Sequence, residues 1–190
     1  MNDSEHEQLN KILKFYEFVL HNRDRYEDGH ARRVGILSIQ LARWLGYSRD
    51  DIESVRFGAR FHDVGKLALS AELLNKKTLT DQDFYEIQQH VQKGFELFMS
   101  IGINGKIGRI IAESHENFDG SGYPKKKGGQ EIYEGARIVR IADTYDTLIS
   151  RRSYKESISP NDAMDEMRRC AVWYDPLIFE IFAEKMTVKD

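Results

Sequence analysis

A histidine and an aspartate stand side by side at the end of one strongly amphipathic segment. Ser48-Arg49-Asp50-Asp51 has the residue types of a helix start, because a serine hydroxyl can accept a backbone N–H there. The inward-facing positions follow at spacings of three and four: Ile52, Val55, Ala59 and His62. An unpartnered polar ring on such a face costs free energy. The chain must therefore fold so that His62 and the adjacent Asp63 find partners inside a helical core.

The same helical period recurs elsewhere and favours an all-α fold, since the chain has only three prolines and little alternation of the β type. We expect helices over 9–20, 30–45, 84–95, 107–115 and from about 134, and two more starting at Ser159-Pro160 and Asp175-Pro176. Residues 67–77 read as a looser connection, and residues 117–135 as one long irregular stretch. We expect Gly65 to suit the turn after His62, and Trp173 to pack in the core.

Composition excludes several classes of protein. The net charge of −3, from 28 basic and 31 acidic residues, predicts no binding to a nucleic acid polymer. No apolar run is long enough to span a membrane, and the first residues do not form a signal peptide. Cys170 is the only cysteine, so no internal disulfide can form and a cytoplasmic location is expected.

Four of the six histidines lie on or beside the apolar face or end of separate predicted helices, and two aspartates are placed similarly. They are His30, His62, His90, His115, Asp63 and Asp143. A shared metal site at the centre of a helical bundle explains all six positions. The alternative is that each group has its own hydrogen-bond partner, such as Arg140 for Asp143. His6 and His21 have polar surroundings and are expected at the surface.

The ligand types indicate the chemistry. Nitrogen and oxygen ligands without thiolate suit Fe, Mn, Zn or Ni. Asp63 is the natural bridge between two metals, because it is the carboxylate next to a ligand histidine. A metal pair can activate water and hold a phosphate oxygen, which predicts hydrolysis of a phosphate ester.

Two other segments carry notable residues. The irregular stretch contains four glycines between Gly120 and Gly129, together with Tyr123 and Pro124, and a loop of this length is typically functional or disordered. We expect Lys125-Lys126-Lys127 to be a solvated tip. Arg151 to Lys155 form a basic loop, for which ordinary solvated charge is the simplest reading.

Taken together, these residues resemble the HD-GYP family, a branch of the HD phosphohydrolase superfamily. The matching positions are His30, the string from His62 to Lys66, His90, the string His115-Glu116-Asn117-Phe118-Asp119-Gly120-Ser121-Gly122-Tyr123-Pro124, Ala136-Arg137, the string from Asp143 to Asp146, Arg152 to Lys155, and Asp175-Pro176. The resemblance covers roughly Gly29 to Phe182.

The resemblance implies an HD-domain helical bundle with a long GYP loop, as a single domain over 1–190. Residues 1–25 would be an N-terminal helix and lead-in, and 26–190 the metal-binding core and C-terminal helices. It also implies hydrolysis of cyclic di-GMP to pGpG or GMP at a centre of two, sometimes three, iron or manganese ions.

The resemblance further implies the roles of individual residues. The metal ligands would be His30, His62, Asp63, His90, His115 and Asp143. Lys66 would act with Asp63 in catalysis, near the metals and the phosphate that is cleaved. Arg152 and Lys155 would hold the substrate phosphates, and the loop with Gly122, Tyr123 and Pro124 would shape the substrate side.

Two departures from the family pattern concern the metals. The family usually has two adjacent histidines where this chain has Ser114-His115, so one ligand of the second metal is missing. Members with a third metal carry a glutamate one turn before the first ligand, whereas this chain has Tyr26 there and Glu27 beside it. We therefore expect at most two metals, the second held more weakly.

Two other functions compete with this prediction. One is a receptor for cyclic di-GMP, or a module that binds signalling proteins, in which Ser114 marks lost activity. The other is a hydrolase of a different cyclic dinucleotide. The retained ligand positions, with Lys66, Arg152 and Lys155, favour the hydrolysis of cyclic di-GMP, because a decayed receptor need not keep His62 and Asp63.

Overall fold

The computed structural model describes residues 3–23, 29–103, 105–150 and 157–187. The helices are α1 (Asp3–His21), α2 (His30–Trp44), α3 (Arg49–Phe61), α4 (Ala71–Leu74), α5 (Asp81–Ser100), α6 (Gly105–Glu113), α7 (Glu134–Ile149), α8 (Pro160–Arg169) and α9 (Pro176–Thr187). Short 3-10 helices lie at η1 (Val64–Ala68), η2 (Gly129–Glu131) and η3 (Ala171–Trp173). No strand occurs in these ranges, so the predicted all-α fold is confirmed.

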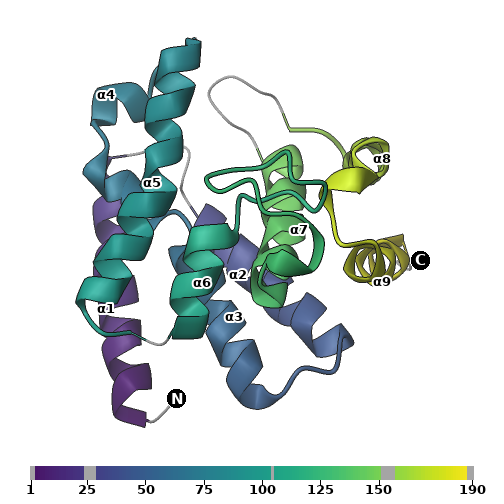
Figure 1. Cartoon of the computed structure of the whole chain (residues 1–190), viewed down its shortest axis with the longest axis horizontal. Helices are drawn as coiled ribbons and strands as arrows, with labels where there is room; N and C mark the ends of the chain where they lie inside the picture. Colours follow the sequence, from purple (N-terminus) through teal and green to yellow (C-terminus); the bar gives the residue numbers. More distant parts are fainter. Residues whose placement is uncertain (1–2, 24–28, 104, 151–156, 188–190) are drawn as a thin grey trace.

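Helix α7 lies between α6 and the pair of helices α8 and α9, as Figure 1 shows. Helices α1 and α5 run along one side of the molecule, and α8 and α9 lie at the opposite side, beyond α7. Helices α2, α3, α6 and α8 all pack against α7. Among the described helices, none is both long enough and apolar enough to cross a bilayer.

Helix α3 is shared by two apolar clusters. Val55 and Ala59 face the cluster formed with α2, α7, α8 and α9, whereas Phe57 and Phe61 face the cluster formed with α1, α5 and α6. The Ser48 side chain caps the start of α3 by accepting the N–H of Asp51 at 3.2 Å, as the sequence predicts. The C-terminal end of α3 is packed against both clusters, through Ala59 on one side and Phe61 on the other.

Gly65 lets η1 approach α5 closely. A Cβ atom at this position would lie 1.8 Å from the carbonyl oxygen of His90 and 2.6 Å from the nitrogen of Gly94. No side chain fits there, so glycine is required by the close approach of two backbones. This contact sets the residues just after α3 against the middle of α5.

Three local predictions differ from the structure in whole or in part. The connection at 67–77 is not loose, because it continues η1 and contains α4, where the Ser70 hydroxyl accepts the N–H of Leu73 at 3.1 Å. His6 is only half-exposed, since its Nε2 lies 3.0 Å from Glu53 and its ring packs against Phe57. Trp173 is half-buried and packs at the edge of a core cluster. His6 looked isolated because Glu53 and Phe57 are distant in the sequence.

Candidate metal centre

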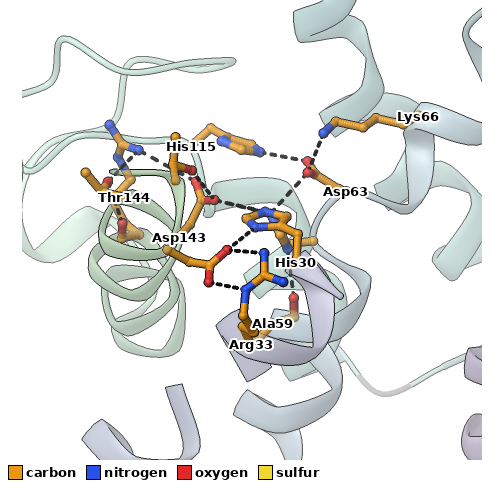
Figure 2. A network of polar contacts seen from close by, with 12 residues as sticks. His30, Arg33, Ala59, Asp63, Lys66, His115, Asp143 and Thr144 are labelled. Atoms are coloured by element: carbon orange, nitrogen blue, oxygen red, sulfur yellow. Dashed lines mark hydrogen bonds and ion pairs between the residues drawn. The ribbon is translucent and has the colours of Figure 1, made fainter. Parts of the chain in front are cut away.

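Side chains from four segments converge at the end of α3. His30 begins α2, His62 and Asp63 follow α3, His115 follows α6, and Asp143 lies on α7. Two groups have ligand atoms close enough to hold a metal ion: His30 with His62 and Asp143, and His62 with Asp63 and His115. Figure 2 shows the cluster with Lys66 beside Asp63.

His30 and His62 face the Asp143 carboxylate. The Nε2 atoms of His30 and His62 lie 3.2 Å and 3.8 Å from Asp143 Oδ1. The Nε2 of His62 also lies 3.3 Å from Asp63 Oδ2. His62 belongs to both groups, so the two carboxylates share one imidazole.

His90 joins the cluster from α5. Its Nε2 lies 3.0 Å from Asp63 Oδ1 and 3.1 Å from Nε2 of His115, which itself lies 3.4 Å from the same Asp63 oxygen. All six predicted ligands are thus brought together. Their roles as ligands remain a prediction.

Three of the four imidazole rings are held by a hydrogen bond from Nδ1, the nitrogen on the far side of the ring from the cluster. The Nδ1–H of His62 donates to the Ala59 carbonyl oxygen at 2.8 Å, and that of His90 donates to the Ile87 carbonyl oxygen at 2.7 Å. His30 donates its Nδ1–H to Asp146 Oδ2 at 2.7 Å. A neutral ring protonated at Nδ1 presents a lone pair at Nε2.

These lone pairs point at carboxylate oxygens and at one another, and such contacts are repulsive unless a metal ion or a proton lies among them. The buried Nε2 of His62 makes no hydrogen bond, although a carboxylate lies nearby. Imidazole nitrogens and carboxylate oxygens are the ligands that suit Zn, Fe and Mn. The residues present therefore fit a divalent metal site.

The electrostatics also favour a cation. Burial raises the pKa of Asp63, but His62 and Lys66 outweigh this effect, and the net pKa lies well below its usual range. Burial lowers the pKa of His62, but Asp63 outweighs it and the net shift is upward. Burial is the main cause that lowers the pKa of His115 to about 4, and His90 adds to it. His115 is thus neutral at pH 7, as a metal ligand must be.

Asp146 supports the cluster in a way that the sequence did not reveal. It is fully buried on α7 and accepts His30 Nδ1–H. Arg33 Nε and Nη2 donate to its two oxygens at 2.6 Å and 3.0 Å. A carboxylate behind a ligand histidine fixes the ring's tautomer and orientation. Its position three residues after Asp143, one turn along the same helix, is the signal that could have found it.

Lys66 lies at the rim of the cluster. Its Nζ is 2.7 Å from Asp63 Oδ2, and its side chain is 12% exposed. The amine therefore balances the charge of the carboxylate at the edge of the cluster. A role of Lys66 near a metal and a substrate stays a prediction.

The segment after α6 covers His115. Between Ser114 and Gly128 it contains no helix or strand, and the Tyr123 ring stacks on His115 with centroids 5.1 Å apart. Gly122 is buried. A larger residue would not fit there, because its Cβ atom would lie 2.5 Å from the carbonyl oxygen of His115. Pro124 is exposed next to Tyr123. Tyr123 thus borders the cluster, and the role of this segment toward a substrate stays a prediction.

Two buried glutamates hold this segment in place. Glu116 accepts the backbone N–H groups of Lys125 at 2.7 Å and Lys127 at 3.1 Å. Glu113 accepts the Tyr133 N–H at 2.6 Å and contacts Lys127 Nζ at 2.8 Å. The prediction of a fully solvated lysine tip was therefore wrong for Lys127, since its partner lies fourteen residues earlier on α6.

Some predicted positions lie outside the described residues: Tyr26, Glu27, Arg152 and Lys155. Ser114 is described and fully buried, and its hydroxyl donates back to the Ile111 carbonyl oxygen at 3.4 Å. It lies beside His115 in the chain. Whether a metal ligand is missing there stays a prediction.

The HD domain model matches residues 14–178 of this chain. A cyclic di-GMP phosphodiesterase of Thermotoga maritima is 32% identical over 180 residues, which are 92% of this chain and 48% of that protein. A 3'3'-cGAMP-specific phosphodiesterase 2 of Vibrio cholerae is 31% identical over 166 residues, which are 85% of this chain and 32% of that protein. The chain thus spans about half the length, or less, of these two relatives.

Among solved structures, Bd1817, an HDG"Y"P protein from Bdellovibrio bacteriovorus, superposes with a TM-score of 0.73 at 18% identity. The match covers 97% of this chain and 64% of that one. At this identity the likeness shows the fold. The family model and the relatives agree, and the chain belongs to the HD domain family, in its HD-GYP branch.

Proposed function

We propose that this chain is a metal-dependent phosphodiesterase that hydrolyses cyclic di-GMP to pGpG or GMP. The observation that carries the proposal is the convergence of four imidazole Nε2 atoms on Asp63 and Asp143. Three of these rings have Nδ1 held by a hydrogen-bond acceptor. A purely structural cluster has no need for lone pairs aimed at carboxylates.

We assign two metal ions to this site, iron or manganese. His30, His62 and Asp143 would hold one, and Asp63, His90 and His115 the other, with Asp63 as the bridge. The second would be held more weakly, because Ser114 replaces a ligand. When bound, such a pair stabilises negative charge on phosphate oxygens and makes a water molecule more acidic.

The protein's own residues supply orientation and charge. Lys66 Nζ, at the rim beside Asp63, is placed to bind a phosphate oxygen. Tyr123 covers His115 and narrows the approach to the cluster. We assign Arg152 and Lys155 to the substrate phosphates, which would fix the dinucleotide in place. Such positioning provides a large share of the rate enhancement in phosphoryl transfer.

A hydrolase of a different cyclic dinucleotide is the second candidate. The relative from Vibrio cholerae, at 31% identity, is named for 3'3'-cGAMP rather than for cyclic di-GMP. Both substrates present the same phosphodiester to the centre, so the residues described here do not separate them. Specificity would come from contacts with the bases.

The test is hydrolysis by the purified chain, loaded with Mn(II) or with Fe(II) under anaerobic conditions. Cyclic di-GMP and 3'3'-cGAMP are each supplied, and the products are separated by chromatography. We expect hydrolysis of at least one, abolished by chelator and restored by metal. A chain that binds metal but hydrolyses neither would contradict the proposal, and binding of cyclic di-GMP without hydrolysis would favour the receptor function.

A further inference from the structure

Arg140 on α7 lies at the edge of the metal centre, one turn before Asp143. Its Nη1 is 3.9 Å from Asp143 Oδ2, which is too long for a hydrogen bond, and the same nitrogen donates to Thr144 Oγ1 at 3.1 Å. In Figure 2, Thr144 and Lys66 lie on opposite sides of the cluster. Arg140 contacts Thr144 and approaches the centre beside Asp143, whereas Lys66 contacts Asp63.

Neutral groups hold this guanidinium in place. Arg140 Nε donates to Asn117 Oδ1 at 2.8 Å, and the guanidinium lies 5.9 Å from the centre of the Trp173 ring. The Asn117 amide is itself fixed, since its nitrogen donates to Ser121 Oγ at 2.9 Å. The side chain is 18% exposed. Arg140 is thus oriented without being neutralised by its anchors.

Other arginines near the centre are already paired. Arg33 donates two hydrogen bonds to the Asp146 carboxylate, and Arg137, one turn before Arg140, forms a close ion pair with Asp175. In the described part of the chain, no carboxylate oxygen lies within hydrogen-bond distance of Arg140. It is a positioned cation whose charge can serve a ligand.

Arg140 is also joined to the segment that covers the centre. Asn117, which accepts its Nε–H at 2.8 Å, lies between His115 and Tyr123 in that segment, and Tyr123 stacks on His115. An anion that reaches the centre beside Asp143 would therefore lie close to the guanidinium.

We propose that Arg140 binds a non-bridging oxygen of the phosphodiester that is cleaved, from the Asp143 side of the centre. The inference rests on the proposed phosphodiesterase function. A guanidinium is planar, always charged and weakly hydrated, and it binds phosphate through two donors at once. Donors that are held in place before the reaction stabilise developing negative charge without reorganisation. Lys66, beside Asp63, and Arg140, beside Asp143, would then bind the same phosphate.

The test compares Arg140→Gln and Arg140→Lys with the wild type. Arg168→Gln is the matched control, because it removes one positive charge from an exposed pair on α8. Metal content, kcat, KM and the affinity for cyclic di-GMP are measured for each metal-loaded protein. We expect Arg140→Gln to lower kcat/KM about 100-fold with unchanged metal content. Arg140→Lys should recover part of the loss, and Arg168→Gln should match the wild type.

Each outcome decides the inference. A kcat/KM for Arg140→Gln within twofold of an active wild type would overturn it and leave the proposed function intact. Loss of metal from Arg140→Gln would also overturn it, because Arg140 would then act by positioning Asp143. If the wild type binds cyclic di-GMP without hydrolysis, at least tenfold weaker binding by Arg140→Gln supports the inference, and equal binding overturns it. A wild type that neither binds nor hydrolyses a cyclic dinucleotide refutes both proposals.

Discussion

Removing the Asp146 carboxylate tests whether this side chain holds the His30 ring in the cluster as described. Asp146→Ala takes away the acceptor of the His30 Nδ1–H. Loss of such a carboxylate behind a ligand histidine typically lowers metal affinity about 10–100-fold. This range corresponds to about 1.4–2.7 kcal/mol of binding free energy.

The same change lowers the stability of the metal-free protein. A buried N–H without a partner costs about 1–3 kcal/mol. The Arg33 side chain is 41% exposed and can return to water, so loss of its ion pair adds only about 0–1 kcal/mol. We expect the free energy of unfolding to fall by about 1–4 kcal/mol. Asp146→Asn should lose less stability, because an amide oxygen can still accept the His30 N–H.

The assay is a metal titration of both variants followed by urea unfolding of the metal-free proteins. Asp165→Ala is the control, since its carboxylate forms an exposed ion pair on α8. If Asp146→Ala binds metal within twofold of wild type, the reasoning about the His30 tautomer is refuted. A loss of stability in the metal-free protein together with normal metal affinity would assign Asp146 to folding alone.

Three further changes address the neighbouring backbone. Gly65→Ala should lower the free energy of unfolding by about 1–3 kcal/mol or more, because its Cβ would overlap the backbone of α5. Gly105→Ala is the control and should not lower it, because a Cβ atom there would have nothing within 4 Å. Equal urea midpoints for the two variants would refute the reasoning. Glu116→Gln replaces one of the two oxygens that accept backbone N–H groups by a donor, so trypsin should cleave faster within residues 125–127. Unchanged cleavage would contradict the role of Glu116 in holding this segment. Ser114→His should raise occupancy of the second metal and hydrolysis at limiting metal, with excess metal narrowing the gap; a gain in neither would show that Ser114 is not a vacated ligand position.

The sequence predicts best where the partner is close along the chain or where a periodic pattern is strong. The spacing of apolar residues placed His62 at the inward end of α3, and capping residues gave the start of that helix. The predicted apolar faces likewise brought His30 and Asp143 together, since each lies on a long helix with a clear buried side.

What the sequence could not give depends on contacts between distant segments. Asp146 reads as one more charge on α7 until His30, 116 residues earlier, is placed against it. Lys127 reads as a solvated tip because Glu113 lies on another element. Gly65 reads as a turn residue, whereas the reason for glycine is the backbone of α5. Arg140 was an expected partner of Asp143, yet its hydrogen bonds go to Asn117 and Thr144.

The central claim is that Asp63 holds two metals at the end of α3, and Asp63→Ala tests it most directly. Elemental analysis of protein loaded with Mn(II), or with Fe(II) without oxygen, would be paired with hydrolysis of cyclic di-GMP. Asp51→Ala is the control, because its carboxylate pairs with Lys106 at the surface. The predicted result is loss of metal and of hydrolysis from Asp63→Ala alone. Full metal content with full hydrolysis in Asp63→Ala would contradict the account.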